Sequence, residues 1–141
     1  MYVGYFLHAV DKKNRIFIPY RFRSGKNNYV LSRGLEKCLW LFDSPRWSQI
    51  LDKFENLSWQ DKSKQRAFKR TLLAGAVECG MDSQGRLIIP SHLMEYAGIR
   101  KESSVIGMGD RIEIWDSAVW KKYSTGFGEK SFAALAEKLD I

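Results

Sequence analysis

The chain has 141 residues, of which 45% are hydrophobic and 28% charged, a balance that excludes a disordered chain and suits a compact protein. No run of about 18 apolar residues occurs, so no transmembrane helix is expected, and the first residues lack the basic start of a signal peptide. The formal net charge of +7 favours polyanionic partners such as nucleic acids.

The positive charge is concentrated in the first half of the chain. Residues 1–70 contain 15 Lys and Arg against 6 Asp and Glu, a balance of +9. Residues 71–141 contain 8 against 10, a balance of −2. The whole positive excess therefore lies in the first half, which is expected to face the polyanion.

Motifs for catalysis, cofactors and metals are missing from the sequence. It contains neither the phosphate-binding pattern G-x-x-x-x-G-K-[ST] nor the nucleophile pattern G-x-S-x-G. Cys38 and Cys79 stand alone, and His8 and His92 lack metal-ligand spacing. We therefore predict a protein with buried thiols that is not an enzyme and has no cofactor, metal, small-molecule substrate or membrane partner.

The first predicted element is a strand over residues 5–10, which are rich in aromatic and β-branched side chains. Asp11 then begins a turn in which its carboxylate accepts backbone hydrogen bonds and Asn14 takes a positive φ. Asn and Gly tolerate that conformation best. After Arg15, residues 16–18 predict a short, largely buried strand that ends at Pro19.

A helical turn and a hairpin are expected next. Residues 20–23 predict the helical turn, which ends at Ser24 and Gly25. Residues 29–32 and 37–42 then predict two strands joined by a loose turn.

Two helices close the first half. Ser44 is the expected N-cap of the first, with Pro45 at the first helical position and apolar residues at helical spacing through Leu57. The second is expected to begin at Ser58 and to end near Gly75.

The second half repeats this order. Residues 11–19 (DKKNRIFIP) match residues 82–90 (DSQGRLIIP), and residues 42–47 (FDSPRW) match residues 115–120 (WDSAVW). Two matches in the same order indicate two structural copies, residues 1–70 and 71–141. No linker rich in Pro and Gly separates them, which favours one intertwined unit over two independent domains.

The elements of the second copy follow from the same signals. A strand at 76–81 precedes the turn of Asp82 and Gly85, after which a buried strand, a helix and a hairpin are expected. A helix capped by Ser117 and a last helix complete the chain. The ranges expected for the buried strand, the helix, the two hairpin strands and the last helix are 87–89, 91–97, 104–108, 111–115 and 129–139.

The pattern D-x-x-G-R followed by three apolar residues and Pro resembles the AbrB/MazE/SpoVT group of small dimeric DNA-binding folds. Two copies, each followed by a [WF]-D-S-x-x-W element and helices, resemble the MraZ family over nearly the whole chain. The resemblance implies a mainly β, α+β fold, in which two pseudo-symmetric AbrB-like β-hairpin modules form one intertwined double-ψ-like barrel unit with flanking helices.

The same resemblance implies a function. It suggests a transcription regulator that binds direct repeats in double-stranded DNA as a ring-like homo-oligomer. The expected target is the promoter of a division and cell-wall gene cluster, which includes the regulator's own operon. The expected location is the cytoplasm, in association with the nucleoid.

Carried over to this sequence, the family's D-x-x-x-R pairs are Asp11 with Arg15 and Asp82 with Arg86. Asn14 departs from the commoner glycine, a change that the turn tolerates. Asp11, Asp82 and Gly85 are expected to brace the turns. The residues expected to contact DNA are Lys12, Lys13, Asn14, Arg15, Arg21, Arg23 and Arg86.

Each arginine has a second interpretation, in which it only pairs with its aspartate. Residues 11–33 carry seven basic side chains, Lys26 and Arg33 among them, and one acidic side chain. Residues 81–116 carry four basic and six acidic ones, and Ser83 and Gln84 replace the two lysines of the first turn. We therefore predict that Arg15 contacts DNA and that Arg86 mainly stabilises its turn.

Other interpretations stay open at this level. A second basic cluster lies in the helix expected to begin at Ser58. It is either a solvated helix face or a contact to DNA or another subunit. An antitoxin-like protein that binds DNA and a toxin is one alternative function, although the apolar residues at 132–139 differ from a disordered acidic tail. An RNA-binding protein is the other. The second cluster consists of Lys62, Lys64, Arg66, Lys69 and Arg70.

Overall fold

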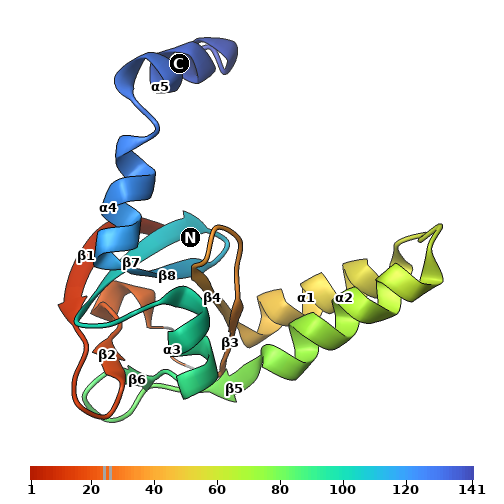
Figure 1. Ribbon diagram of the computed structural model, residues 1–141, viewed down its shortest axis with the longest axis horizontal. Coiled ribbons are helices and arrows are strands. Elements are labelled where there is room, and N and C mark those ends of the chain that lie inside the picture. The colour runs from red at the N-terminus through yellow and green to blue at the C-terminus, as the bar shows by residue number, and fades with distance from the viewer. Residues whose placement is uncertain (24, 26) are drawn as a thin grey trace.

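The computed structural model describes residues 1–23, 25 and 27–141. The expected end of the helical turn at Ser24 and the charge of Lys26 lie outside the described residues. Two antiparallel sheets form the body: a six-stranded sheet of order β1-β7-β8-β4-β3-β5 and a pair of short strands, β2 and β6 (Figure 1).

The elements of the first half follow the expected order: β1 (Tyr2–Ala9), β2 (Arg15–Phe17), the 3-10 turn η1 (Tyr20–Phe22), β3 (Tyr29–Arg33), β4 (Leu39–Asp43), α1 (Ser44–Asn56) and α2 (Lys62–Gly75). Those of the second half are β5 (Val77–Cys79), β6 (Arg86–Ile88), α3 (Ser91–Ala97), β7 (Glu102–Gly109), β8 (Ile112–Asp116), α4 (Ser117–Thr125) and α5 (Glu129–Lys138). The predicted division between residues 70 and 71 falls inside α2 and stays a prediction.

The two halves are intertwined through their strands. β1 pairs with β7, and its counterpart β5 pairs with β3, so the first strand of each half joins the other half. The counterparts β2 and β6 pair with each other, as do β4 and β8. The strands on either side of each Asp turn therefore do not form a hairpin together, since each finds its partner across a pseudo-twofold axis.

The main core lies between the two sheets, and a smaller cluster forms around Cys38, Ile106 and Trp115. Leu31, Leu39 and Leu41 point into it from the six-stranded sheet, and Ile16 and Leu87 do so from the β2–β6 pair, all of them at most 1% exposed. Phe22 of η1 and Leu93 of α3 complete the packing. Burying these side chains in one cluster makes the halves a single unit, as the mainly β, α+β fold with two modules requires.

The helix caps differ from those expected. Asp43 rather than Ser44 caps α1, because its Oδ1 accepts the amide of Arg46 at 2.9 Å. Asp116 rather than Ser117 caps α4 in the same way. Asp61 rather than Ser58 caps α2. An ionised carboxylate is a stronger acceptor for helix amides than a hydroxyl, which explains the preference.

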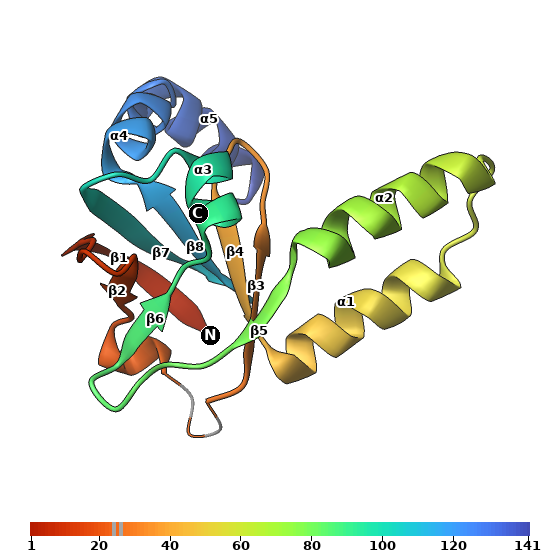
Figure 2. The ribbon, with the colours of Figure 1, turned by 60° about the horizontal axis from the view of Figure 1, so that its bottom comes forward.

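Four helices lie outside the body. α1 and α2 form a hairpin that projects to one side, and α4 leads to α5 on another (Figures 1 and 2). None of these four helices contains a fully buried residue. Among the described residues, no helix is both long and apolar enough to cross a bilayer.

Candidate nucleic-acid interface

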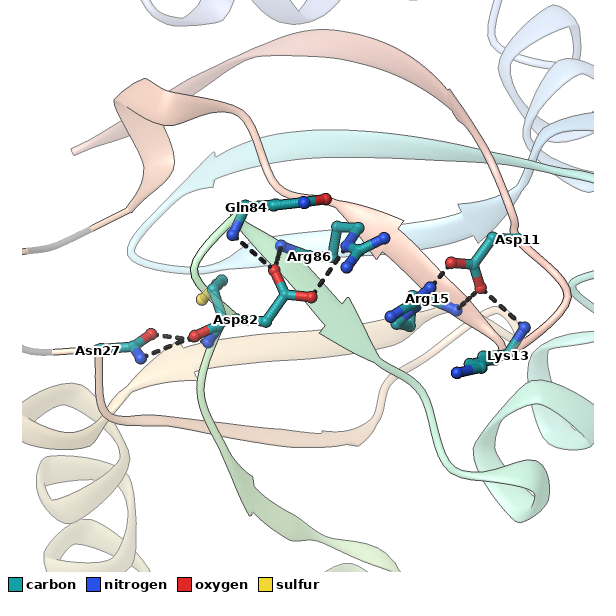
Figure 3. A network of polar contacts seen from close by, with 8 residues as sticks. Asp11, Lys13, Arg15, Asn27, Asp82, Gln84 and Arg86 are labelled. Atoms are coloured by element: carbon teal, nitrogen blue, oxygen red, sulfur yellow. Dashed lines mark hydrogen bonds and ion pairs between the residues drawn. The ribbon is translucent and has the colours of Figure 1, made fainter.

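The first Asp turn is held by the carboxylate of Asp11. Its Oδ1 accepts the amides of Lys13 at 2.8 Å and Arg15 at 2.9 Å, and its Oδ2 accepts Nε of Arg15 at 2.7 Å (Figure 3). Asn14 has a φ of 59°, the positive value expected for the last turn position. The aspartate thus fixes both the backbone of the turn and the direction of the arginine side chain.

The second turn repeats this arrangement. Asp82 accepts the amides of Gln84 and Arg86 and Nε of Arg86, each at 2.9 Å (Figure 3). Gly85 has a φ of 78°. The geometry of the two turns is the same although only the first contains lysines.

Both arginines lie on one face, which we call the β2–β6 face and define as Arg15, Phe17, Arg86 and Ile88. Arg15 lies opposite Ile88, and Phe17 lies opposite Arg86, in the antiparallel pair. Side chains alternate along a strand, so these four point outward while their neighbours enter the core. The site is thus built from both halves of the chain.

Hydrogen bonds between the halves lock the face in place. The amide of Ile18 donates to the carbonyl of Gly85 at 3.0 Å, and the amide of Ile89 donates to the carbonyl of Asn14 at 2.9 Å. Each turn is therefore attached to the strand that follows the other turn.

Each arginine keeps donors available. Nε is bound to the aspartate, but the terminal nitrogens of Arg15 and Arg86 form no hydrogen bond with any described residue. The two side chains are 22% and 23% exposed. A guanidinium has five N–H donors, so four remain for an external acceptor. Pairing with aspartate and binding a phosphate or a base are consequently compatible roles.

Arg23 changes the electrostatic comparison of the two turns. It comes from the first half, yet its guanidinium packs against Gly85, where an added Cβ would lie only 2.4 Å from Nη1. The charge count over residues 81–116, from which Arg86 was predicted to lie outside the positive field of the first turn, did not include this arginine. Counting charges along the chain assigned Arg23 to the wrong turn, because the fold crosses between halves.

The remaining predicted contacts are divided between two places. Lys12 and Lys13 are exposed on the first turn, next to the β2–β6 face. Arg21 is exposed on η1, and its guanidinium lies 5.9 Å from the centre of the Phe6 ring. That contact ties Arg21 to β1 rather than to either turn.

Two apolar residues of the face were missed by the sequence analysis. Phe17 and Ile88 are 46% and 61% exposed, although their segments were expected to be largely buried. The alternation of side chains along a strand could have predicted the exposure of Phe17 and Ile88, because the residues on either side of both are buried. His8 of β1 has its ring centre 6.1 Å from that of Phe17, and burial lowers the pKa of this histidine.

The second basic cluster lies on α2, away from the β2–β6 face (Figure 1). Lys69 forms an ion pair with Glu55 of α1. The other members of the cluster are exposed. Both interpretations of this cluster, a solvated face and a contact surface, remain compatible with its position.

The turn carboxylates have low pKa values. Hydrogen bonds from the amide and then the side chain of Arg15 lower the pKa of Asp11 below its ordinary 3.8. Arg86 lowers the pKa of Asp82 through the same two contacts. Each group is therefore ionised in the folded protein at any pH near neutrality.

These pKa values predict an acid-sensitive stability. A carboxylate whose pKa is lowered in the folded state makes its full contribution to stability at pH values above its ordinary pKa of 3.8. That contribution is lost as the pH falls through the pKa of the folded state. We expect an Asp11→Asn, Asp82→Asn double variant to melt below the native protein at about pH 6, with a gap that narrows toward about pH 3. Thermal melting across this range is the measurement. A gap that stays constant with pH would show that the carboxylate charge contributes nothing.

The comparison with protein families decides the chain's membership. The model of the family described as "MraZ protein, putative antitoxin-like" matches residues 1–71 and again residues 72–140. The chain belongs to the MraZ family. The double match agrees with the repeat found in the sequence, and the two MraZ matches each contain one Asp turn.

Relatives cover almost the full chain. A MraZ protein of Caldanaerobacter subterraneus subsp. tengcongensis is 43% identical over 141 residues, 99% of this chain and 97% of the relative. One of Pelotomaculum thermopropionicum is 41% identical over 99% of this chain and 95% of its own length. One of Carboxydothermus hydrogenoformans is 39% identical, with 99% and 96% covered. All three carry the name transcriptional regulator MraZ.

Proposed function

We propose that this protein is a transcription regulator that binds double-stranded DNA through the β2–β6 face. The observation that carries the proposal is the pair of arginines that two aspartates orient on one exposed face, with terminal nitrogens that no described residue binds. The names of the MraZ relatives support regulation of transcription.

A two-stranded β ribbon is of a size that the DNA major groove admits. In this proposal Arg15 and Arg86 donate to guanine, the base that arginine binds through two acceptors. Phe17 and Ile88 supply apolar contacts for a thymine methyl group. Lys12, Lys13 and Arg23 surround this face with charges for phosphates, which position the protein without reading sequence.

One β2–β6 face offers few base contacts. We therefore propose that several protomers act together as a ring-like homo-oligomer on direct repeats, because linked sites gain affinity through effective concentration. The proposed target is the promoter of a division and cell-wall gene cluster, including the regulator's own operon. The protein would act there on the nucleoid, in the cytoplasm.

Duplex RNA fits the face less well than DNA. The major groove of an A-form helix is deep and narrow, so side chains on a ribbon do not reach its base edges. The antitoxin-like alternative is favoured by the description of the matched family. It would require a toxin bound elsewhere on the chain, and the exposed helix α5 is the segment available for it.

Mobility shifts test the proposal. A duplex from the region upstream of the protein's own gene, a shuffled duplex and an RNA duplex of equal length would compete for the protein. We expect the upstream duplex to bind best and the RNA duplex worst. Equal competition by all three would overturn sequence-specific DNA binding. Light scattering on the free protein would separately test assembly, which a strictly monomeric mass at micromolar concentration would exclude.

A further inference from the structure

The guanidinium of Arg23 lies on the second Asp turn, although Arg23 belongs to the first half of the chain. A Cβ added to Gly85 would lie 2.4 Å from Nη1, 2.5 Å from Cζ and 3.0 Å from Nε of this arginine. Gly85 is buried, whereas the three residues before it in the turn are exposed. The arginine therefore occupies the space that any other residue at position 85 would need for its side chain.

Two further contacts hold Arg23 in this position. Its Cζ lies 5.2 Å from the centre of the Tyr20 ring, within the range of a cation–π contact. Its amide donates to the carbonyl of Tyr20 at 3.1 Å, and Phe22 between the two residues is buried in the core. We call Tyr20 and Gly85 the Arg23 seat. Because the seat orders the side chain in advance, less conformational entropy remains to be lost when the guanidinium binds a partner.

The charge of Arg23 is not compensated within the described part of the chain. Its guanidinium forms no ion pair or hydrogen bond with a described residue, and its Nε is buried without a partner among them. Arg15 and Arg86, in contrast, are each paired with an aspartate. An uncompensated, partly desolvated charge costs free energy, and an anion bound at the terminal nitrogens would offset that cost.

The internal repeat shows that the seat is not duplicated at the first turn. Residues 11–19 match residues 82–90, an offset of 71. At this offset the counterparts of the three parts are Ser91 for Tyr20, Met94 for Arg23 and Asn14 for Gly85. The second half thus supplies neither a ring nor a cation to the first turn, which carries two lysines of its own. The two ends of the β2–β6 face obtain their cations by different means.

We propose that Arg23 is a preorganised phosphate clamp at the second turn, and that Gly85 is the positioning residue that makes room for it. A guanidinium binds a phosphate through two parallel N–H donors, so its fixed orientation sets the position of the DNA backbone. The inference rests on the proposed DNA binding and adds to it a contact that reads no base. It also accounts for glycine in the second turn where the first has asparagine.

Gly85→Asn separates the position of Arg23 from its charge. Asparagine supports such a turn, as Asn14 does with a φ of 59°, but its side chain would displace the guanidinium while the net charge stays unchanged. We expect the affinity for the upstream duplex to fall about tenfold, the effect of losing a hydrogen bond to a charged group. Arg23→Met should cause a similar loss. The double variant should bind no more weakly than Arg23→Met alone, because both changes remove one contact.

Two further variants control this test. Gly98→Asn is the matched control, because Gly98 also has a positive φ, 63°, and nothing lies within 4 Å of a Cβ added there. It should bind like the native protein. Tyr20→Ser removes the other part of the seat at a position that is 83% exposed, so this variant is expected to fold. It should weaken binding in the native background but not in the Arg23→Met background. Thermal melting checks that each variant is folded at the assay temperature, and the Tyr20→Ser comparison decides the test if Gly85→Asn is not.

Native affinity of Arg23→Met, or losses from the two single variants that multiply in the double variant, would overturn the clamp. The shuffled duplex distinguishes this result from a failure of the proposed function. Each seat variant should lose the same factor on the upstream and shuffled duplexes, because a phosphate contact carries no sequence information. Equal binding of both duplexes by the native protein would remove sequence-specific recognition but leave that factor measurable. A loss confined to the upstream duplex would show that Arg23 reads a base and would contradict the clamp. A native protein that binds neither duplex would overturn both proposals.

Discussion

Replacing Arg15 by alanine should lower the affinity for the native operator by roughly 5- to 150-fold per engaged site, the effect of losing a base contact worth about 1–3 kcal/mol. Arg86→Ala should lower it by a similar factor, because Nε of both arginines is bound to aspartate and both side chains are equally exposed. Sequence alone predicted that Arg86 would act mainly on stability. The position of Arg23 beside Gly85 adds a positive charge to the second turn, which reduces the electrostatic difference between the two turns.

Titration against the operator and thermal melting would measure the two effects separately. Arg15→Lys keeps the charge but cannot reproduce the forked geometry, so it should fall between the native protein and Arg15→Ala. Lys121→Ala removes one exposed charge from α4, away from the β2–β6 face, and serves as the control. If the Arg15→Ala protein binds the operator with native affinity, Arg15 has only a structural role. A large fall in melting temperature only for Arg86→Ala would restore the asymmetry predicted from sequence.

Affinity for DNA should fall about a thousandfold between 50 and 200 mM salt. If two protomers engage the DNA, their Lys12, Lys13 and Arg23 side chains bring six charges to phosphates. Each neutralised phosphate contributes about −0.9 to the slope of log affinity against log salt concentration, so we expect a slope of roughly −5. The double variant Lys12→Gln, Lys13→Gln removes four of the six and should reduce the slope to roughly −2.

A matched control exists for this measurement. Lys121 and Lys122 are also adjacent and exposed, but they lie on α4 rather than beside the β2–β6 face. Replacing both by Gln should leave the slope unchanged. A native slope near zero would exclude phosphate contacts as the source of affinity, and an equal change in both double variants would show that only net charge matters.

The local structure was largely predictable from sequence. Positive φ values at Asn14 and Gly85 followed from the turn pattern, and the order of strands and helices followed from periodicity and the repeat. Those features depend on neighbouring residues, which a single sequence displays. The caps of α1 and α4 were displaced because an Asp directly precedes the expected Ser at the start of each helix and is the stronger acceptor.

Long-range features were not predictable in the same way. The pairing of Arg15 with Ile88 joins positions far apart in sequence, and no local signal identifies such a partner. Arg23 was assigned to the first turn for the same reason. The two halves also differ in the length of a helix, 13 residues in α1 and 9 in α4, a difference that the apolar spacing of either helix does not predict.

The pseudo-twofold pairing of β2 with β6 makes the two ends of the β2–β6 face similar in backbone geometry. A surface with true twofold symmetry would fit a DNA site equally well when turned end for end, and successive protomers on one duplex would lie in random orientations. Here one end carries Lys12 and Lys13, and the other carries the neutral Ser83 and Gln84. That difference gives the β2–β6 face a polar axis, which runs from the lysines of the first turn to the neutral residues of the second. The direct repeats proposed as the target also all point the same way, so a face with such an axis would bind each of them in one orientation.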